Sequence, residues 1–372
     1  MAAFRLRRHG LSPRLAGCPD GSGGRPAAVA EATCGIHAQV MGTTDLQVWA
    51  RCPAPAAGAV ARALWEDRTL VRTWCMRGTL HLLTPAQLAL YSAVFDPGGQ
   101  YTPVWYRAFD VTPAEMEALY AALLEALAAG EPLTRRDLAA AVTTLAGERL
   151  GARLRSGWGE LLKPAARGGL FVNGPNRGAE TTYVRTDRWL GQALPPSPDP
   201  PAARAEWLRR YLRAYGPASA ADYARWLGVR QLSRVKAAVA ALGGEVTEVR
   251  VAGRRLLALA ADVHELVAGD TGTAAVVRLL PGFDPYVLGH ADRAHLLDAE
   301  QVRQVYRTAG WISPTIVWEG RILGTWEHRV EADAVVVRVT PFGSLDAVLR
   351  SHIEDEAERL AAHFDRRLAL YT

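Results

Sequence analysis

The sequence contains almost no lysine. Lys163 and Lys236 are the only lysines among the 43 basic residues, and the formal net charge is +5. The other basic residues are arginines, whose planar guanidinium groups form paired hydrogen bonds to phosphate and stack on bases. A G+C-rich coding sequence would also favour arginine, so the ratio alone leaves both explanations open. The net positive charge is the better indication of a nucleic-acid partner.

The chain also lacks long apolar runs and closely paired cysteines. No stretch approaches the roughly 20 apolar residues that span a bilayer, and no apolar segment follows the basic N-terminus. The four cysteines, Cys18, Cys34, Cys52 and Cys75, form no Cys-x-x-Cys pair. The nine histidines show no spacing typical of metal ligands. We therefore expect a cytoplasmic protein with reduced thiols and with no membrane segment, no metal and no cofactor.

The composition is that of a globular protein with several modules. Hydrophobic residues make up 49% and charged residues 22% of the 372 residues. This length exceeds one ordinary core, because domains commonly hold about 100–150 residues. Candidate linkers rich in proline or glycine lie at 96–99 and 194–201. The expected modules are 1–110, 111–193, 202–260 and 270–372.

The clearest module is 202–260. Its segments are, in order, predicted helices at 202–215, 219–228 and 230–244 and predicted strands at 245–251 and 254–260. Ser219 is the expected N-cap of the second helix, and Ala252-Gly253 is the expected turn between the strands. Three helices followed by a hairpin are typical of a winged helix-turn-helix.

A similar order of elements recurs upstream, clearly in 111–193 and in a more broken form in 1–110. Recurrence of one unit predicts a tandem array.

The module 270–372 differs, with a predicted hairpin about Glu319-Gly320, a third strand at 333–341 and a long helix at 345–370. We therefore expect an α+β fold, mainly helical, built from tandem winged helix-turn-helix modules.

Four strings along the chain resemble a known family. They are GIHAQV at 35–40, LVRTWCMRGTLHLL at 70–83, LLPGFDPYVLGHADR at 279–293 and GRILGTWE at 320–327. In this order they resemble the winged-helix superfamily of bacterial DNA glycosylases, whose best-known member confers resistance to the alkylating antibiotic azinomycin. The resemblance spans nearly the whole chain. It implies winged helices arranged around a DNA-binding channel.

The resemblance also implies an activity. It indicates a monofunctional glycosylase that hydrolyses the N-glycosidic bond of alkylated purines, of the N7-alkylguanine type, and leaves abasic sites. Bulky antibiotic adducts and crosslinks belong to the same substrate class, and the implied role is DNA repair and self-resistance. The expected partner is double-stranded DNA, and the expected state is a monomer.

The catalytic motif of the family, two glutamines separated by an apolar residue, falls on His37-Ala38-Gln39, with histidine in place of the first glutamine. Residues two apart share a face only in extended or turn backbone, so we expect the chain to leave helical geometry here, which Gly35 permits. Gln39 would orient a water molecule. His37, with an ordinary pKa near 6.5, would accept its proton or a hydrogen bond. Without the family, a polar pair at a helix edge would be the ordinary interpretation.

Basic residues supply the candidate DNA contacts. They are Arg72 and Arg77 on a predicted strand, Arg230, Arg234 and Lys236 on the third helix of 202–260, and Arg254 and Arg255 in its hairpin. For Arg72 and Arg77 an internal pairing is an equal alternative to a phosphate contact. Structural roles are expected for Asp284, which precedes Pro285 in a turn, and for the tryptophans Trp74, Trp158, Trp226, Trp311 and Trp326.

Two other functions remain open at this point. One is a non-catalytic winged-helix regulator, and the other is a histidine-dependent metal hydrolase. The histidine spacing disfavours the hydrolase. Several winged-helix copies together with the motif at 37–39 favour the glycosylase, because regulators usually carry one copy and a dimerisation or ligand domain. The absence of lysine near the motif argues against a Schiff-base lyase step.

Overall fold

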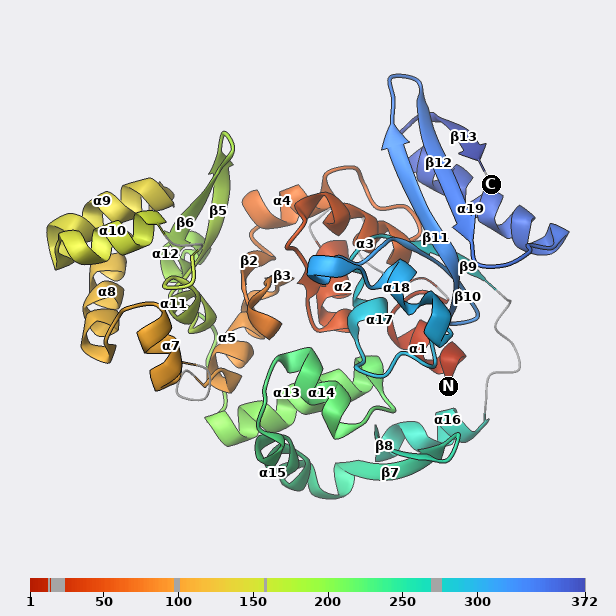
Figure 1. Cartoon of the computed structure of the whole chain (residues 1–372), viewed down its shortest axis with the longest axis horizontal. Helices are drawn as coiled ribbons and strands as arrows, with labels where there is room; N and C mark the ends of the chain where they lie inside the picture. The colour runs from red at the N-terminus through yellow and green to blue at the C-terminus, as the bar shows by residue number, and fades with distance from the viewer. Residues whose placement is uncertain (13, 15–23, 97–100, 157–158, 269–275, 372) are drawn as a thin grey trace.

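The computed structural model describes residues 1–12, 14, 24–96, 101–156, 159–268 and 276–371. Cys18, Trp158 and residues 97–99 of the first predicted linker lie outside these ranges. The fold mixes helices and sheets (Figure 1). Among the described residues no helix is both long enough and apolar enough to cross a membrane.

A six-stranded sheet joins the first two expected modules (Figure 1). Its strands, in order across the sheet, are β1 (Ile36–His37), β3 (Leu80–Leu83), β2 (Val71–Trp74), β5 (Phe171–Arg177), β6 (Glu180–Arg185) and β4 (Leu133–Thr134). β2 pairs antiparallel with β5 through Arg72 and Asn173. The ranges 1–110 and 111–193 therefore share one sheet.

The helices of residues 1–193 follow one another in chain order. They are α1 (Ala2–Arg8), α2 (Gly24–Thr33), α3 (Thr44–Arg51), α4 (Ala59–Trp65), α5 (Pro85–Val94), α7 (Pro103–Ala108), α8 (Pro113–Ala126), α9 (Arg135–Ala146), α10 (Glu148–Ser156), α11 (Lys163–Arg167) and α12 (Thr186–Leu190). Local sequence fixes several of their starts. α5, α8 and α9 each begin after a threonine that forms a capping box with the residue three positions on.

The range 202–260 has the predicted order of three helices and a hairpin. Its elements are α13 (Pro200–Tyr215), α14 (Ala220–Leu227), α15 (Leu232–Leu242), β7 (Val246–Val251) and β8 (Arg254–Leu259). Ser219 caps α14 as expected, through a capping box with Asp222. The short helix α16 (Val263–Ala268) follows.

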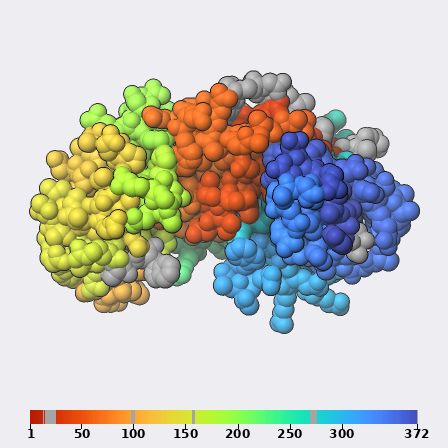
Figure 2. All heavy atoms as spheres, turned by 90° about the horizontal axis from the view of Figure 1, so that it is seen from above, coloured from red at the N-terminus to blue at the C-terminus, as the bar shows by residue number. Residues whose placement is uncertain are grey.

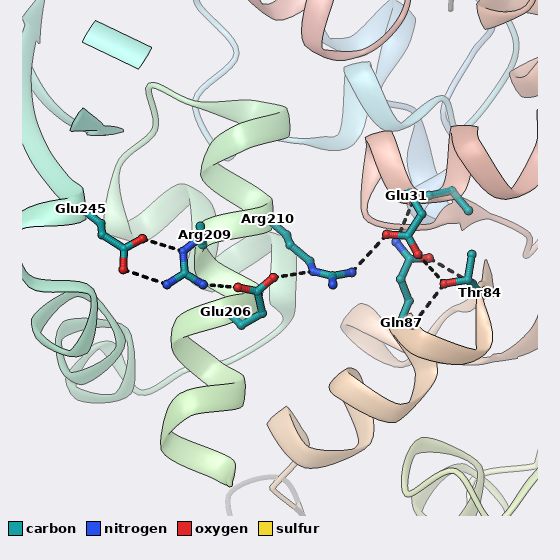
Figure 3. Close-up of polar contacts among 8 residues, drawn as sticks. Glu31, Thr84, Gln87, Glu206, Arg209, Arg210 and Glu245 are labelled. Atoms are coloured by element: carbon teal, nitrogen blue, oxygen red, sulfur yellow. Dashed lines mark hydrogen bonds and ion pairs between the residues drawn. The ribbon is translucent and has the colours of Figure 1, made fainter. Parts of the chain in front are cut away.

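A network of partly exposed charges ties α13 to its neighbours (Figure 3). Arg209 donates to Glu245, which directly precedes β7, and also contacts Glu206. Arg210 donates to Glu206 at 2.8 Å and to Glu31 of α2 at 3.1 Å. Glu31 in turn accepts a hydrogen bond from the threonine that caps α5. Ion pairs of this exposure add little stability individually, so their main effect is to orient α13 on the N-terminal part.

The C-terminal part is a five-stranded sheet covered by one long helix. The strand order is β13 (Arg367–Tyr371), β12 (Ala334–Pro341), β11 (Arg321–Val330), β10 (Thr315–Trp318) and β9 (Val277–Leu280), with α17 (Pro285–Leu288), α18 (Val302–Val305) and α19 (Ala347–His363) alongside. The predicted hairpin and third strand are confirmed. Figure 2 shows this part and the 111–193 part at opposite ends, with the N-terminal part between them.

The expected helix at 345–370 is wrong in its last residues. α19 ends at His363, and Asp365 turns the chain with φ 53°. Residues 367–371 then form β13, which pairs in parallel with β12. The helix prediction fails at these residues because Leu368 and Leu370 alternate as in a strand, and because β12 has a free edge on which β13 can pair.

The core of the C-terminal sheet includes part of the N-terminal helix α3. Trp49 and Leu46 of α3 pack in the same cluster as the β9 and β10 side chains. In the same contact, the guanidinium of Arg51 forms two hydrogen bonds to Asp284, at 2.7 and 2.8 Å. Both side chains are fully buried, with 0% exposure. Asp284 also accepts the Tyr286 N–H at 2.9 Å as the N-cap of α17, so the expected structural role is confirmed.

We predict that Asp284→Ala lowers the free energy of unfolding by roughly 3–5 kcal/mol, because it leaves the Arg51 charge buried without a counter-ion. Denaturant unfolding followed by circular dichroism measures the change. Glu180→Ala is the matched control, since it breaks an exposed ion pair with Arg136 at 3.3 Å, and exposed pairs contribute at most about 1 kcal/mol. Equal losses in the two variants would contradict the prediction.

Candidate functional site

The motif at 37–39 lies where the chain changes from helix to strand. α2 ends at Thr33, and Ile36–His37 form β1, which places His37 opposite His81 of β3. Gly35 has φ +106°, and a Cβ there would lie 2.8 Å from the side chain of Leu83. Only glycine fits both conditions without strain. The predicted departure from helical geometry is confirmed.

The ring of His37 is held on two sides. It stacks on Phe283 with a centroid distance of 4.9 Å and an interplanar angle of 4°, and it meets His81 edge-on at 5.2 Å. Phe283 itself has φ 62°, a conformation that a bulky residue rarely adopts. The carbonyl oxygen of His37 accepts a hydrogen bond from Nε2 of the fully buried Gln47 of α3, at 2.9 Å. The imidazole therefore has a fixed position.

Burial changes the acid–base chemistry of His37. The side chain is 5% exposed, and burial, followed by the charge of Arg77, lowers its pKa to about 3. The expectation of a pKa near 6.5 is therefore wrong, because a charged imidazole would lose its hydration here. His37 is therefore neutral at pH 7, and its buried Nδ1 has no hydrogen-bond partner among the described residues.

Gln39 lies at the surface two residues further along. Its side chain is exposed, and its Oε1 accepts the N–H of Leu80 at 3.2 Å. Between the two polar residues, Ala38 is fully buried and bonded through its N–H to the Leu80 carbonyl at 2.8 Å. The backbone hydrogen bond orients the Gln39 amide, while the second lone pair of Oε1 and the amino group have no partner among the described residues.

Arg72 and Arg77 are directed toward the protein itself. Arg72 is 8% exposed and donates to the Ala38 carbonyl at 3.3 Å. Arg77 is half-buried and donates to the Trp226 carbonyl at 2.6 Å, close to Gly228, where a Cβ would lie 2.8 Å from the Arg77 Cα. The structure thus shows the internal pairing at both positions. Each arginine supplies donors to carbonyl groups at a packed junction.

The other predicted arginines and Lys236 differ in what they contact. Arg234 pairs with Asp96, Arg254 with Asp292, and Arg255 lies 4.0 Å from Glu248. Arg230 and Lys236 are exposed, and neither forms an ion pair in the described ranges. Arg230 and Lys236 are thus the members of this set most available to an external anion.

Two further arginines, Arg225 and Arg293, were not singled out by the sequence analysis. Arg225 is exposed on α14, directly before the Trp226 that binds Arg77. Arg293 lies over the ring of Tyr306 at 3.4 Å. Burial lowers the pKa of both Arg77 and Arg293, and the charge of Arg225 acts in the same direction on each. Arg293 ends the string at 279–293, which was the available signal for it.

The tryptophans and cysteines largely follow expectation. Trp74, Trp226 and Trp326 are buried, but Trp311 is 48% exposed, so the expected core position is wrong for Trp311. Trp311 lies in a tight turn and not on a helix or strand face, which explains the error.

Cys34, Cys52 and Cys75 are buried free thiols. Within the described ranges, no three histidine, cysteine or carboxylate side chains are grouped as metal ligands would be.

Comparison with known proteins identifies the family of this chain. The family model described as DNA glycosylase AlkZ-like matches residues 30–363. The interstrand DNA cross-link repair glycosylase of Streptomyces sahachiroi is 37% identical over 96% of this chain and 94% of that protein. The solved structure of Streptomyces sahachiroi DNA glycosylase AlkZ aligns with a TM-score of 0.87 and 34% identity, over 99% of this chain and 98% of that one. These matches span both polar residues of the motif, and the chain belongs to the AlkZ-like family of DNA glycosylases.

Proposed function

We propose that this protein hydrolyses the N-glycosidic bond of alkylated purines, of the N7-alkylguanine type, in double-stranded DNA. The observation that carries the proposal is the pair formed by His37 and Gln39, two oriented polar groups at the end of β1 on either side of the buried Ala38. A relative named as an interstrand cross-link repair glycosylase supports bulky adducts and crosslinks as members of the substrate class. The product is an abasic site with an intact backbone.

The chemistry requires a positioned water and little else. A purine alkylated at N7 is cationic and leaves as a neutral base with the electron pair of the C1′–N9 bond, so it needs no proton. The sugar becomes an oxocarbenium-like cation, which water attacks at C1′. Gln39 accepts a hydrogen bond from that water through the free lone pair of Oε1, and its dipole stabilises the cationic sugar. His37 accepts a second hydrogen bond.

The low pKa of His37 suits this reaction. A neutral imidazole adds no positive charge beside a cationic sugar, whereas a protonated one would repel it. Once the oxygen of the water bonds to C1′, the water becomes a strong acid, so even a weakly basic neighbour can pass its proton to solvent. His37 therefore acts as a neutral hydrogen-bond acceptor here. A general base that titrates near neutral pH is not required.

The protein must also hold the DNA around the reacting base. We propose that the segments 111–193 and 202–260 act as tandem winged helices around a DNA-binding channel, and that the protein works as a monomer. Arg225, Arg230, Lys236 and Arg293 supply phosphate contacts. Figure 2 shows the surface hollowed on one side, between the 111–193 part and the segment near residue 300, which gives a duplex a place to lie. No observation favours the regulator or the metal hydrolase.

We predict that His37→Ala and Gln39→Ala each lower base release at least about tenfold, as expected for loss of a positioned polar group. The assay uses a duplex with one N7-methylguanine, followed by alkaline cleavage at abasic sites under single-turnover conditions. Gln192→Ala removes an exposed amide outside the site and serves as the control. Full activity in the double variant at 37 and 39 would place the catalytic groups elsewhere.

We also predict that the single-turnover rate is flat between about pH 6 and 8, because the pKa of His37 lies near 3 and the ring stays neutral. His37→Gln removes the titratable group and should show the same flat profile. If the wild-type rate alone fell about tenfold per pH unit below about 6.5, the ordinary histidine pKa, the imidazole would be a titrating base and the neutral role would be wrong.

We predict that replacing Arg230 and Lys236 together by alanine weakens DNA binding equally for all sequences. The plot of log Kd against log salt concentration should become less steep by about 0.9 for each lost phosphate contact. Fluorescence anisotropy at several salt concentrations measures both effects. Arg329→Ala, at an exposed ion pair with Glu331 in the C-terminal sheet, is the control. An unchanged slope, or a strong preference for one sequence, would contradict the prediction.

A further inference from the structure

One aromatic side chain on the surface is connected to the catalytic histidine. Trp311 is 48% exposed, and among the described residues it is the only tryptophan with a large exposed surface. A single exposed apolar side chain is ordinary by itself. Trp311 differs from such residues because it contacts Phe283, which stacks on His37.

A row of ring contacts leads from Trp311 to the site. The indole meets Phe283 edge-on at 5.2 Å, and Phe283 stacks on His37 at 4.9 Å. The separation of Trp311 from His37 is thus set by one intervening ring. The two centroid distances place the indole no more than about 10 Å from the imidazole. A purine whose C1′ lies by His37 and Gln39 would have its base within reach of the indole.

The backbone presents Trp311 in a fixed way. The turn after α18 is closed by the Trp311 N–H bonding to the Thr308 carbonyl at 3.2 Å and by the Arg307 N–H bonding to the Trp311 carbonyl at 2.8 Å. Ala309 and Gly310 both have positive φ, of 55° and 75°, which makes the turn tight. An exposed ring on a stiff support loses little conformational entropy when it binds.

The charges around this turn suit a polyanion. Arg303 and Arg307 are exposed, and neither has an ion-pair partner in the described parts of the chain. Arg293 lies over Tyr306, one residue before Arg307. An exposed aromatic ring beside unpaired arginines is the combination that nucleic-acid-binding surfaces use for bases and phosphates. The segment near residue 300 also borders the hollowed side of the molecule (Figure 2).

We propose that Trp311 contacts the alkylated purine and gives the site its preference for a cationic base. Alkylation at N7 places a positive charge on the purine, and an indole face attracts cations more strongly than any other side-chain ring. An undamaged guanine is neutral and gains only ordinary stacking. This inference rests on the proposed function, since it assigns the charged base to the same site.

The experiment measures binding without base release. The probe is a duplex with one N7-methylguanine on a 2′-fluoro sugar, which blocks cleavage, and the reference is the same duplex with guanine. Anisotropy gives the ratio of the two Kd values for the wild type and for Trp311→Ala, Trp311→Phe and Leu145→Ala. Leu145 is equally exposed, at 50%, but lies on α9 in the 111–193 part. Thermal melting confirms that each variant is folded.

Trp311→Ala should reduce the preference for the lesion by about 5- to 30-fold, the range that a desolvated cation–π contact supplies. Trp311→Phe should retain part of the preference, and Leu145→Ala should retain all of it. An unchanged ratio in Trp311→Ala, or no lesion preference in the wild type, would overturn the inference. Failure of the proposed function appears separately, as wild-type protein that releases no base from the natural N7-methylguanine duplex.

Discussion

The buried ion pair between Arg51 and Asp284 is the contact on which the site depends. It joins α3, in the N-terminal part, to the start of α17, 233 residues further along the chain. Phe283 directly precedes Asp284 and stacks on His37, while Gln47, one turn before Arg51, binds the His37 carbonyl. One helix therefore holds His37 from its backbone and, through the ion pair and Phe283, from its ring. This pair adds an oriented polar contact to the apolar packing of Leu46 and Trp49 against the C-terminal sheet.

A buried ion pair is a costly way to achieve stability, because desolvation can exceed the attraction between the charges. The effect of the Arg51–Asp284 pair is to fix the orientation of α3 relative to α17. Two hydrogen bonds between a planar guanidinium and a carboxylate permit one relative orientation, and any displacement leaves a charge unpaired in the interior. A reaction that depends on a positioned water needs such precision, since misplacement by an ångström can remove most of the catalytic advantage.

Local features of the fold followed from the sequence, and long-range features did not. Capping residues such as Ser219, the helices and hairpin of 202–260 and the extended backbone after Gly35 depend on neighbours a few positions away. The strand β13 depends on a parallel partner some 30 residues earlier, so its apolar residues were assigned to the preceding helix. At the site, the motif could be located from the resemblance. The inward direction of Arg72 and the low pKa of His37 could not, because both arise from burial by segments distant in sequence. The exposure of Trp311 likewise depends on a turn that only the folded chain defines.

The close approach of Gly228 to Arg77 bears on how a duplex can fit. At this point the end of α14 rests on the backbone next to β2, with no room for even one methyl group. No side chain lies between the two backbones here, so neither can shift without a steric clash. The junction therefore resists relative movement of α14 and the N-terminal part. If this junction does not move when DNA binds, the deformation needed for a close fit falls on the DNA, which bends, unwinds or unstacks. Damaged steps yield more readily than intact ones. At a packed junction of this kind, a DNA step that deforms readily costs less to accommodate than one that does not.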